Sequence, residues 1–129
     1  MKFFQTTTAR WLLVVLVMAA IFVGSSTPEP EDEWEILGTT DKLLHWVVYA
    51  FLGWALYRAT KAGDRRSEAL CAAAAVLIAA LYGVSDEFHQ SFVPGRDVSS
   101  LDWAADVLGA ATAAAILYIR SAREVRRNG

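Results

Sequence analysis

The chain has 129 residues, of which 55% are hydrophobic and 20% charged, and its formal net charge at pH 7 is -2. A chain this apolar is atypical of a soluble globular domain, and its length fits one domain. The one cysteine, Cys71, excludes an internal disulfide, and its alanine-rich setting favours packing over reactivity. We therefore expect a single membrane domain over residues 1–129.

The first apolar run, residues 9–26, is long enough to cross a bilayer core. With Lys2 and Arg10 as a basic region, it also fits a signal peptide. We favour a retained spanning helix, because the later apolar runs need a helical partner. Residues 27–40 then combine two prolines with five acidic residues, which predicts a solvent-exposed loop.

Three further apolar runs follow, and each predicts a spanning helix: residues 41–59, 69–85 and 101–119. The first of them contains His45 as its one residue that titrates near neutral pH. The other two are rich in alanine, which suits close packing between helices. No alternating strand pattern recurs, so the sequence predicts an all-α, integral membrane four-helix bundle.

Basic residues gather at one predicted side of the membrane. Ten of the twelve Lys and Arg residues flank the ends of the apolar runs that would face the cytoplasm: Lys2, Arg10, Arg58, Lys61, Arg65, Arg66, Arg120, Arg123, Arg126 and Arg127. Lys42 and Arg96 fall on the other side. This bias predicts that both termini are cytoplasmic and that residues 82–106 face outward.

Three polar residues of the second run share one helix face, because they are four positions apart: Asp41, His45 and Tyr49. Asp41 could simply cap that helix. His45 is expected to face the bundle interior, where an imidazole can form a hydrogen bond or carry a proton. Tyr49 could fill space with its hydroxyl satisfied.

A second polar group follows the third run at the same outer level: Asp86, Glu87, His89 and Gln90. A carboxyl group beside an imidazole can act as an acid–base pair. An interfacial salt-bridge network explains the same residues without chemistry. Gln90 is expected to orient a partner through a hydrogen bond.

The segment between the third and fourth runs contains a Pro94-Gly95 pair, which predicts a type II turn that brings Arg96 over the helix ends. Arg96 is then placed either to neutralise Asp102 and Asp106 or to hold an anionic headgroup. Ser99 with Asp102 matches a capping box, which explains Asp102 structurally.

Asp106 lies one turn deeper than Asp102 and is followed by the small residues Gly109, Ala110 and Ala113. A charged carboxylate at this depth is costly, so it needs a proton or a partner among Arg96, His45 and Lys42. We regard Asp106 as the strongest single candidate for a functional residue.

Known ligand-binding motifs are absent from the sequence. It has no HExxH helix, no cysteine pair and no glycine-rich phosphate loop, so we assign no metal ligand, although His45, Glu87 and His89 with an aspartate offer the right atoms. The cofactor stays unknown. The acidic outer side disfavours nucleic acid as a partner and leaves the lipid bilayer as the expected one.

The polar residues occur in an ordered pattern over residues 41–110: Asp-Lys-x-x-His-x-x-x-Tyr, Asp-Glu-x-x-Gln, Pro-Gly-Arg, and an aspartate four residues before Asp106 with Gly109 after it. In this pattern the chain resembles the VanZ-like family of small bacterial membrane proteins. The resemblance implies a multi-helix membrane protein of the cell envelope, and the founding member is associated with resistance to the glycopeptide teicoplanin.

We combine these observations into a pocket that binds an anionic or lipid-linked envelope molecule. The binding residues would be Asp41, Lys42, Tyr49, Asp86, His89, Gln90, Arg96 and Asp102. One alternative is a membrane-embedded hydrolase or transferase in which His45, Glu87 and Asp106 are catalytic. Another is a structural or interaction protein without turnover, in which the polar network locks the helices together.

Overall fold

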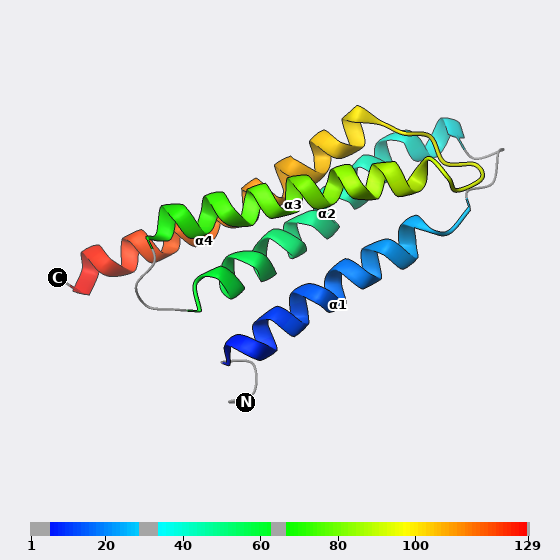
Figure 1. The fold of residues 1–129 in the computed structure, drawn as a ribbon. Coiled ribbons are helices and arrows are strands. Elements are labelled where there is room, and N and C mark those ends of the chain that lie inside the picture. The colour runs from blue at the N-terminus through cyan, green and yellow to red at the C-terminus, as the bar shows by residue number, and fades with distance from the viewer. Residues whose placement is uncertain (1–5, 29–33, 63–66, 129) are drawn as a thin grey trace.

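The computed structural model describes residues 6–28, 34–62 and 67–128, and these form four helices (Figure 1). Their bounds are α1 Thr7–Ser25, α2 Trp34–Thr60, α3 Glu68–Gln90 and α4 Ser100–Asn128. The described residues contain no strand, so the prediction of an all-α fold is confirmed.

Three helices extend well beyond the apolar runs that predicted them. α2 begins at Trp34, so Asp41 lies inside the helix, which excludes the alternative that Asp41 caps it. The prolines that break helices precede Trp34, and residues 34–40 contain none. α3 continues to Gln90, so Asp86, Glu87 and His89 lie on its last turns. α4 continues past residue 119 to Asn128.

Three of the helices, α1, α3 and α4, are long and apolar enough to cross a membrane, as expected of a membrane protein. α2 falls outside this group and carries Asp41, Lys42 and His45 among its apolar residues. Among the described residues, α2 and α3 each contact all three other helices, whereas α1 contacts only α2 and α3. The contact between α2 and α4 is the most extensive of all.

Large apolar side chains face outward from all four helices. Leu16 of α1, Leu44 of α2, Leu81 of α3 and Leu108 of α4 are each at least half exposed. An apolar surface spread over every helix is not tolerated by a monomeric protein in water. Lipid chains are the surroundings that match it.

The closest helix contact is between α2 and α4, where two glycines lie. A Cβ atom on Gly53 would come within 2.6 Å of the Cα of Ala110, and one on Gly109 would overlap the carbonyl oxygen of Trp46. The predicted small-residue strip after Asp106 therefore lies in this contact, where it lets the two backbones approach.

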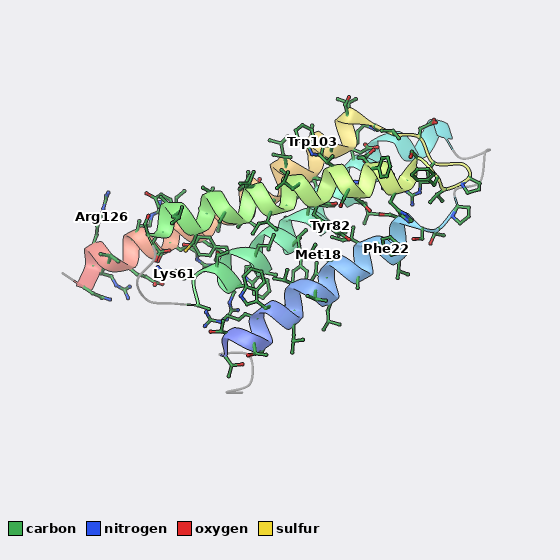
Figure 2. All side chains as sticks on the ribbon, viewed as in Figure 1. Met18, Phe22, Lys61, Tyr82, Trp103 and Arg126 are labelled. Carbon is green, nitrogen blue, oxygen red and sulfur yellow. The ribbon has the colours of Figure 1, made fainter. Side chains whose placement is uncertain are left out.

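The first residues of α1 and α3 and the last residues of α2 and α4 lie at one end of the bundle, as Figure 1 shows. Lys61 and Arg126 lie toward this end in Figure 2, whereas Phe22 lies toward the other. The second end carries the α3–α4 connection and the predicted polar site. Some predicted charges fall outside the described residues: Lys2, Arg65 and Arg66 of the basic group, and Glu29, Glu31, Asp32 and Glu33 of the acidic loop.

We predict that Gly109→Ala lowers the free energy of unfolding in detergent micelles by about 1–3 kcal/mol, because the methyl group forces α2 and α4 apart. Gly24→Ala is the matched control, since a Cβ atom at Gly24 would meet nothing within 4 Å. Thermal or denaturant unfolding followed by circular dichroism measures both. Equal stability of the two variants would contradict the close approach.

Candidate functional site

Helices α2, α3 and α4 bring their acidic and basic side chains together at one end of the bundle. Buried there are His45 from α2, Asp86, Glu87 and Gln90 from α3, and Asp102 and Asp106 from α4. These residues are far apart in the sequence, and the antiparallel course of the helices returns them to the same level.

A buried contact between His45 and Asp106 lies at the centre of this group. Nδ1 of His45 is 2.8 Å from Oδ1 of Asp106, and the Asp106 side chain is fully buried. An ionised carboxylate only accepts hydrogen bonds, so Nδ1 carries the proton in this contact. The prediction that Asp106 needs a partner among three named residues is met by His45.

The second nitrogen of His45 faces a less buried carboxylate. Nε2 lies 3.9 Å from Oδ1 of Asp41, one helical turn earlier in α2. Beside them, Nζ of Lys42 lies 3.3 Å from Oδ1 of Asp102. Lys42 and His45 of α2 therefore each face one aspartate of α4.

Tyr49 reaches a third aspartate from the same face of α2. Its hydroxyl donates to Oδ2 of Asp86 over 3.5 Å, and Nε2 of Gln90 donates to the same oxygen over 3.4 Å. The predicted orienting role of Gln90 is thus realised within α3, on Asp86.

Glu87 joins the end of α3 to the start of α4. Its Oε2 accepts a hydrogen bond of 2.8 Å from the backbone N–H of Ser99, and Oγ of Ser99 accepts one of 3.3 Å from the N–H of Asp102. The predicted serine cap is therefore present. The group that satisfies the backbone of Ser99 is Glu87, whereas a capping box would use Asp102 for it.

Arg96 contacts the end of α1, whereas the sequence placed it either to neutralise Asp102 and Asp106 or to hold an anionic headgroup. The turn before it forms as predicted, with Gly95 at φ 79° and the N–H of Arg96 bonded to the carbonyl of Val93 at 3.2 Å. Nε and Nη2 of Arg96 donate to the carbonyls of Thr27 and Gly24. Asp102 and Asp106 are paired with Lys42 and His45.

His89 also faces α1 and stands apart from the other predicted site residues. Its ring stacks on Phe22 with 4.3 Å between centroids, and Nε2 lies 2.9 Å from Oγ of Ser26. The imidazole that lies near Glu87 is that of His45, from another helix.

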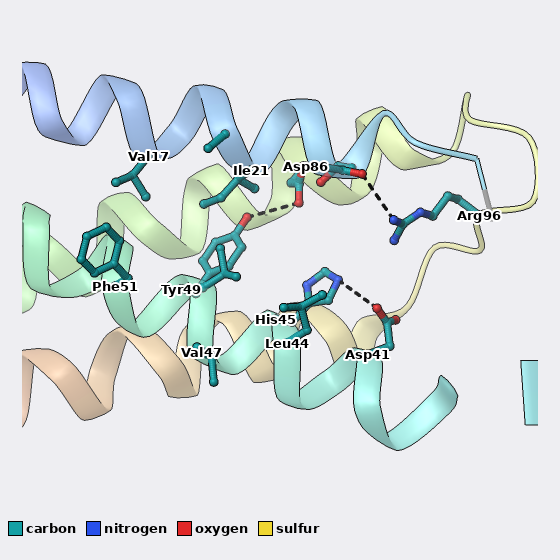
Figure 3. A pocket seen from close by; sticks show the side chains of 14 residues that line it. Val17, Ile21, Asp41, Leu44, His45, Val47, Tyr49, Phe51, Asp86 and Arg96 are labelled. Carbon is teal, nitrogen blue, oxygen red and sulfur yellow. Dashed lines mark hydrogen bonds and ion pairs between the residues drawn. The ribbon is translucent and has the colours of Figure 1, made fainter. Parts of the chain in front are cut away.

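A cavity of about 450 Å³ opens between α1, α2 and the end of α3. Its polar end is lined by Asp41, His45, Asp86 and Arg96, with Tyr49 midway. Val17, Ile21 and Phe51 line the rest, and Figure 3 shows them on the side away from Arg96. The cavity is therefore polar at one end and apolar at the other.

A comparison with protein families shows which family the chain belongs to. The model of the family described as VanZ/LLP1 matches residues 4–121. The chain belongs to the VanZ/LLP1 family. No curated protein and no solved structure matches it.

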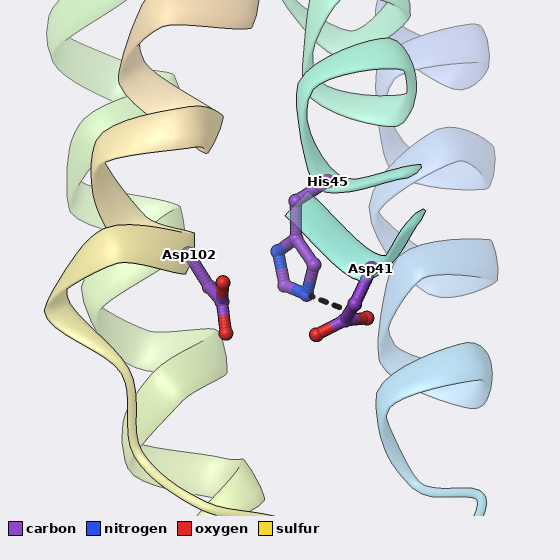
Figure 4. A group of neighbouring side chains, drawn as sticks. All are labelled: Asp41, His45 and Asp102. Carbon is purple, nitrogen blue, oxygen red and sulfur yellow. Dashed lines mark ion pairs between the residues drawn. The ribbon is translucent and has the colours of Figure 1, made fainter. Parts of the chain in front are cut away.

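Among the described residues of this VanZ/LLP1 protein, two groups of side chains have the atoms to hold a metal ion. Asp41, His45 and Asp102 form one, shown in Figure 4, and His45, Glu87 and Asp106 form the other. Within each group the candidate ligand atoms all lie within 4.8 Å of one another. The sequence indicated His45 and Glu87 with an unspecified aspartate, but it added His89, which belongs to neither group.

The wall that α1 contributes to the cavity was also missed. Val17, Ile21 and Gly24 line it, and they belong to an apolar run whose composition indicates only a spanning helix. A hydrogen bond of 2.6 Å from the Tyr82 hydroxyl to the carbonyl of Met18 joins α3 to this helix; both residues are labelled in Figure 2. No sequence signal identifies a backbone carbonyl as a partner.

We predict that Asp106→Ala costs about 3–5 kcal/mol of stability, because it leaves His45 buried without its partner. Asp97→Ala is the matched control, because Asp97 is an exposed aspartate in the α3–α4 connection and its loss should cost less than about 1 kcal/mol. Denaturant unfolding in micelles measures both. If His45 and Asp106 pair directly, the double variant His45→Ala/Asp106→Ala should lose less stability than the sum of the losses of His45→Ala and Asp106→Ala. Additive losses would contradict a direct pair.

Proposed function

We propose that this VanZ/LLP1 protein binds a lipid-linked molecule of the cell envelope in the cavity between α1 and α2. The observation that supports this most is the division of the cavity, with Asp41, His45, Asp86 and Arg96 at one end and Val17, Ile21 and Phe51 toward the other. Its volume of about 450 Å³ lies within the usual range for small-molecule sites.

The polar end suits a headgroup with several hydrogen-bonding groups. Carboxylates of Asp41 and Asp86 accept from hydroxyl or amide donors, and the Arg96 guanidinium favours an anionic group. The apolar side chains of α1 and α2 would contact the lipid chain. Both requirements are met by an amphiphile of the kind used to build bacterial envelopes.

We further propose that both termini are cytoplasmic, so that this site faces outward across the bacterial cytoplasmic membrane. The grouping of charges supports this orientation. Arg10 donates to the carbonyl of Arg58 over 3.1 Å, and Lys61 pairs with Glu68, so these cations share the end opposite the site. The association of the family with teicoplanin resistance fits an outward-facing envelope site and is part of the proposal.

A second candidate is acid–base chemistry on the bound molecule. The buried contact of 2.8 Å between His45 and Asp106 favours it, because a carboxylate that orients an imidazole is a common arrangement in hydrolases and transferases. In that reaction His45 would move the proton and Glu87 would be a second acid or base. A ligand recovered with its headgroup cleaved or transferred would distinguish turnover from binding alone.

Binding is tested with a fluorescent polyprenyl-linked sugar phosphate and the protein in lipid nanodiscs. We expect Ile21→Trp, which fills the apolar part of the cavity, and Asp86→Asn, which removes an acceptor, each to weaken binding about tenfold, or 1.4 kcal/mol. Leu16→Trp is the control, because Leu16 is exposed on α1 and does not line the cavity.

The sugar phosphate without its lipid should bind far more weakly than the intact probe. Mass spectrometry of the recovered probe then shows whether it has been cleaved. The cavity is refuted as the binding site if Ile21→Trp and Asp86→Asn bind the probe as tightly as the unsubstituted protein does. If the polar network has only a structural role, the protein should show no saturable binding of the probe.

Orientation is tested by cysteine labelling in intact cells, in a Cys71→Ala background. We predict that Asp97→Cys, in the α3–α4 connection, reacts with a membrane-impermeant maleimide, whereas Arg123→Cys, near the end of α4, reacts only after lysis. Both positions are exposed in the structure, so accessibility within the fold does not distinguish them. The opposite labelling pattern would reverse the orientation.

A further inference from the structure

The acidic groups buried at the polar end outnumber the cations that face them. Asp86, Glu87, Asp102 and Asp106 are each at most 6% exposed. Among the described residues, Lys42 pairs with Asp102 and His45 with Asp106. Buried carboxylates are costly unless they are paired or coordinate a metal. A further positive charge in this region would reduce that cost.

Four buried carboxylate oxygens of this group accept no hydrogen bond: Oδ1 of Asp86, Oε1 of Glu87, Oδ1 of Asp102 and Oδ2 of Asp106. Oδ1 of Asp102 faces the ammonium of Lys42, and Asp86 belongs to neither group of candidate metal ligands among the described residues, which leaves Glu87 and Asp106. The second oxygen of each of these two residues is engaged, Oε2 of Glu87 by the N–H of Ser99 and Oδ1 of Asp106 by His45. These contacts hold both carboxyl groups in place. The other oxygen of each group keeps its lone pairs and accepts no hydrogen bond.

The imidazole of His45 completes the group. Candidate ligand atoms of His45, Glu87 and Asp106 lie within 4.8 Å of one another, and all three side chains are buried. Ligands of a tetrahedral zinc ion are about 3.4 Å apart, given bonds of about 2.1 Å. Small side-chain rotations would therefore bring the three onto one ion. Each residue comes from a different helix, so the ion would also tie α2, α3 and α4 together.

We propose that His45, Glu87 and Asp106 bind one divalent transition-metal ion, and that zinc is the best match. One imidazole and two carboxylates suit zinc, whereas magnesium and calcium prefer oxygen ligands alone. In this site the ion would take the place of the proton on Nδ1 of His45, so Nδ1 would be the ligand atom and the imidazole would carry its N–H on Nε2. Nε2 faces Asp41, and a carboxylate that accepts from the second nitrogen is common behind metal-bound histidines.

The other possible group, Asp41 with His45 and Asp102, is less suited to a metal. Lys42 already places its ammonium 3.3 Å from Asp102, and Asp41 is a quarter exposed. The metal site also goes beyond the proposed lipid-linked ligand, because Glu87 and Asp106 do not line the cavity and His45 alone belongs to both.

The test measures zinc binding by competition with a chromophoric chelator, on full-length protein purified without a polyhistidine tag and in a Cys71→Ala background. We expect one zinc ion per chain, with magnesium and calcium unable to displace it. Glu87→Gln and Asp106→Asn should each weaken binding at least about tenfold, since even loss of an outer-shell group costs that much. Asp86→Asn is the matched control, a neighbouring buried carboxylate outside the site, and should leave zinc affinity unchanged.

Several results would overturn the proposal. The first is the absence of saturable zinc binding. The second is a loss of zinc affinity in Asp86→Asn as large as that in Glu87→Gln. The third is a loss of zinc affinity in Asp102→Asn while Glu87→Gln still binds zinc. If the Glu87 or Asp106 variants fail to fold, the zinc X-ray absorption spectra of the unsubstituted protein and of Asp102→Asn decide. One imidazole with carboxylate oxygens in both proteins supports the site. Any other ligand set, or one that changes in Asp102→Asn, rejects it. Asp86→Asn separates the two proposals, because it should weaken the lipid-linked probe and spare zinc.

Discussion

The buried contact between His45 and Asp106 is the interaction on which the rest of the polar end depends. Asp106 is fully buried, and its carboxylate would be highly unfavourable there without the imidazole 2.8 Å away. The pair fixes the rotation of α2 relative to α4, and that rotation places Lys42 beside Asp102 and Tyr49 beside Asp86. A polar network of this kind specifies one arrangement of otherwise interchangeable apolar helices.

The contact between α2 and α4 makes this pairing possible. Gly53 and Gly109 let the two backbones approach where any side chain would clash, so charged groups at the end of the same interface are held within hydrogen-bonding distance. Helices in lipid gain little from hydrophobic burial against one another, and close packing and hydrogen bonds take its place. The small residues and the buried polar pair therefore act together along a single interface.

α1 is packed less extensively than the other helices, and this has a consequence for function. It contacts α2 and α3 but not α4 among the described residues, and the cavity lies along its inner face. Its links to the bundle include the hydrogen bond from Tyr82 to Met18 and those from Arg96 to Gly24 and Thr27. Val14, Val17 and Ile21 of α1 are buried in the core. A helix with fewer neighbours than the others can still border a cavity that a tightly packed bundle would fill with side chains.

The sequence by itself determined the all-α class, the number of helices, the family, the turn at Gly95 and the face shared by His45 and Tyr49. These follow from local signals, namely the length of the apolar runs, the separation of four residues between His45 and Tyr49, and the positive φ that glycine permits. It misplaced the start of α2 and the ends of α3 and α4, because at these ends the helix includes polar and charged residues that lie outside the apolar run. Only the tertiary structure decided that Asp106 pairs with His45, that Arg96 contacts carbonyls of α1, and that Glu87 satisfies the backbone of Ser99. Those partners lie on different helices, and which of several nearby charges meet depends on how closely and at what rotation the helices pack.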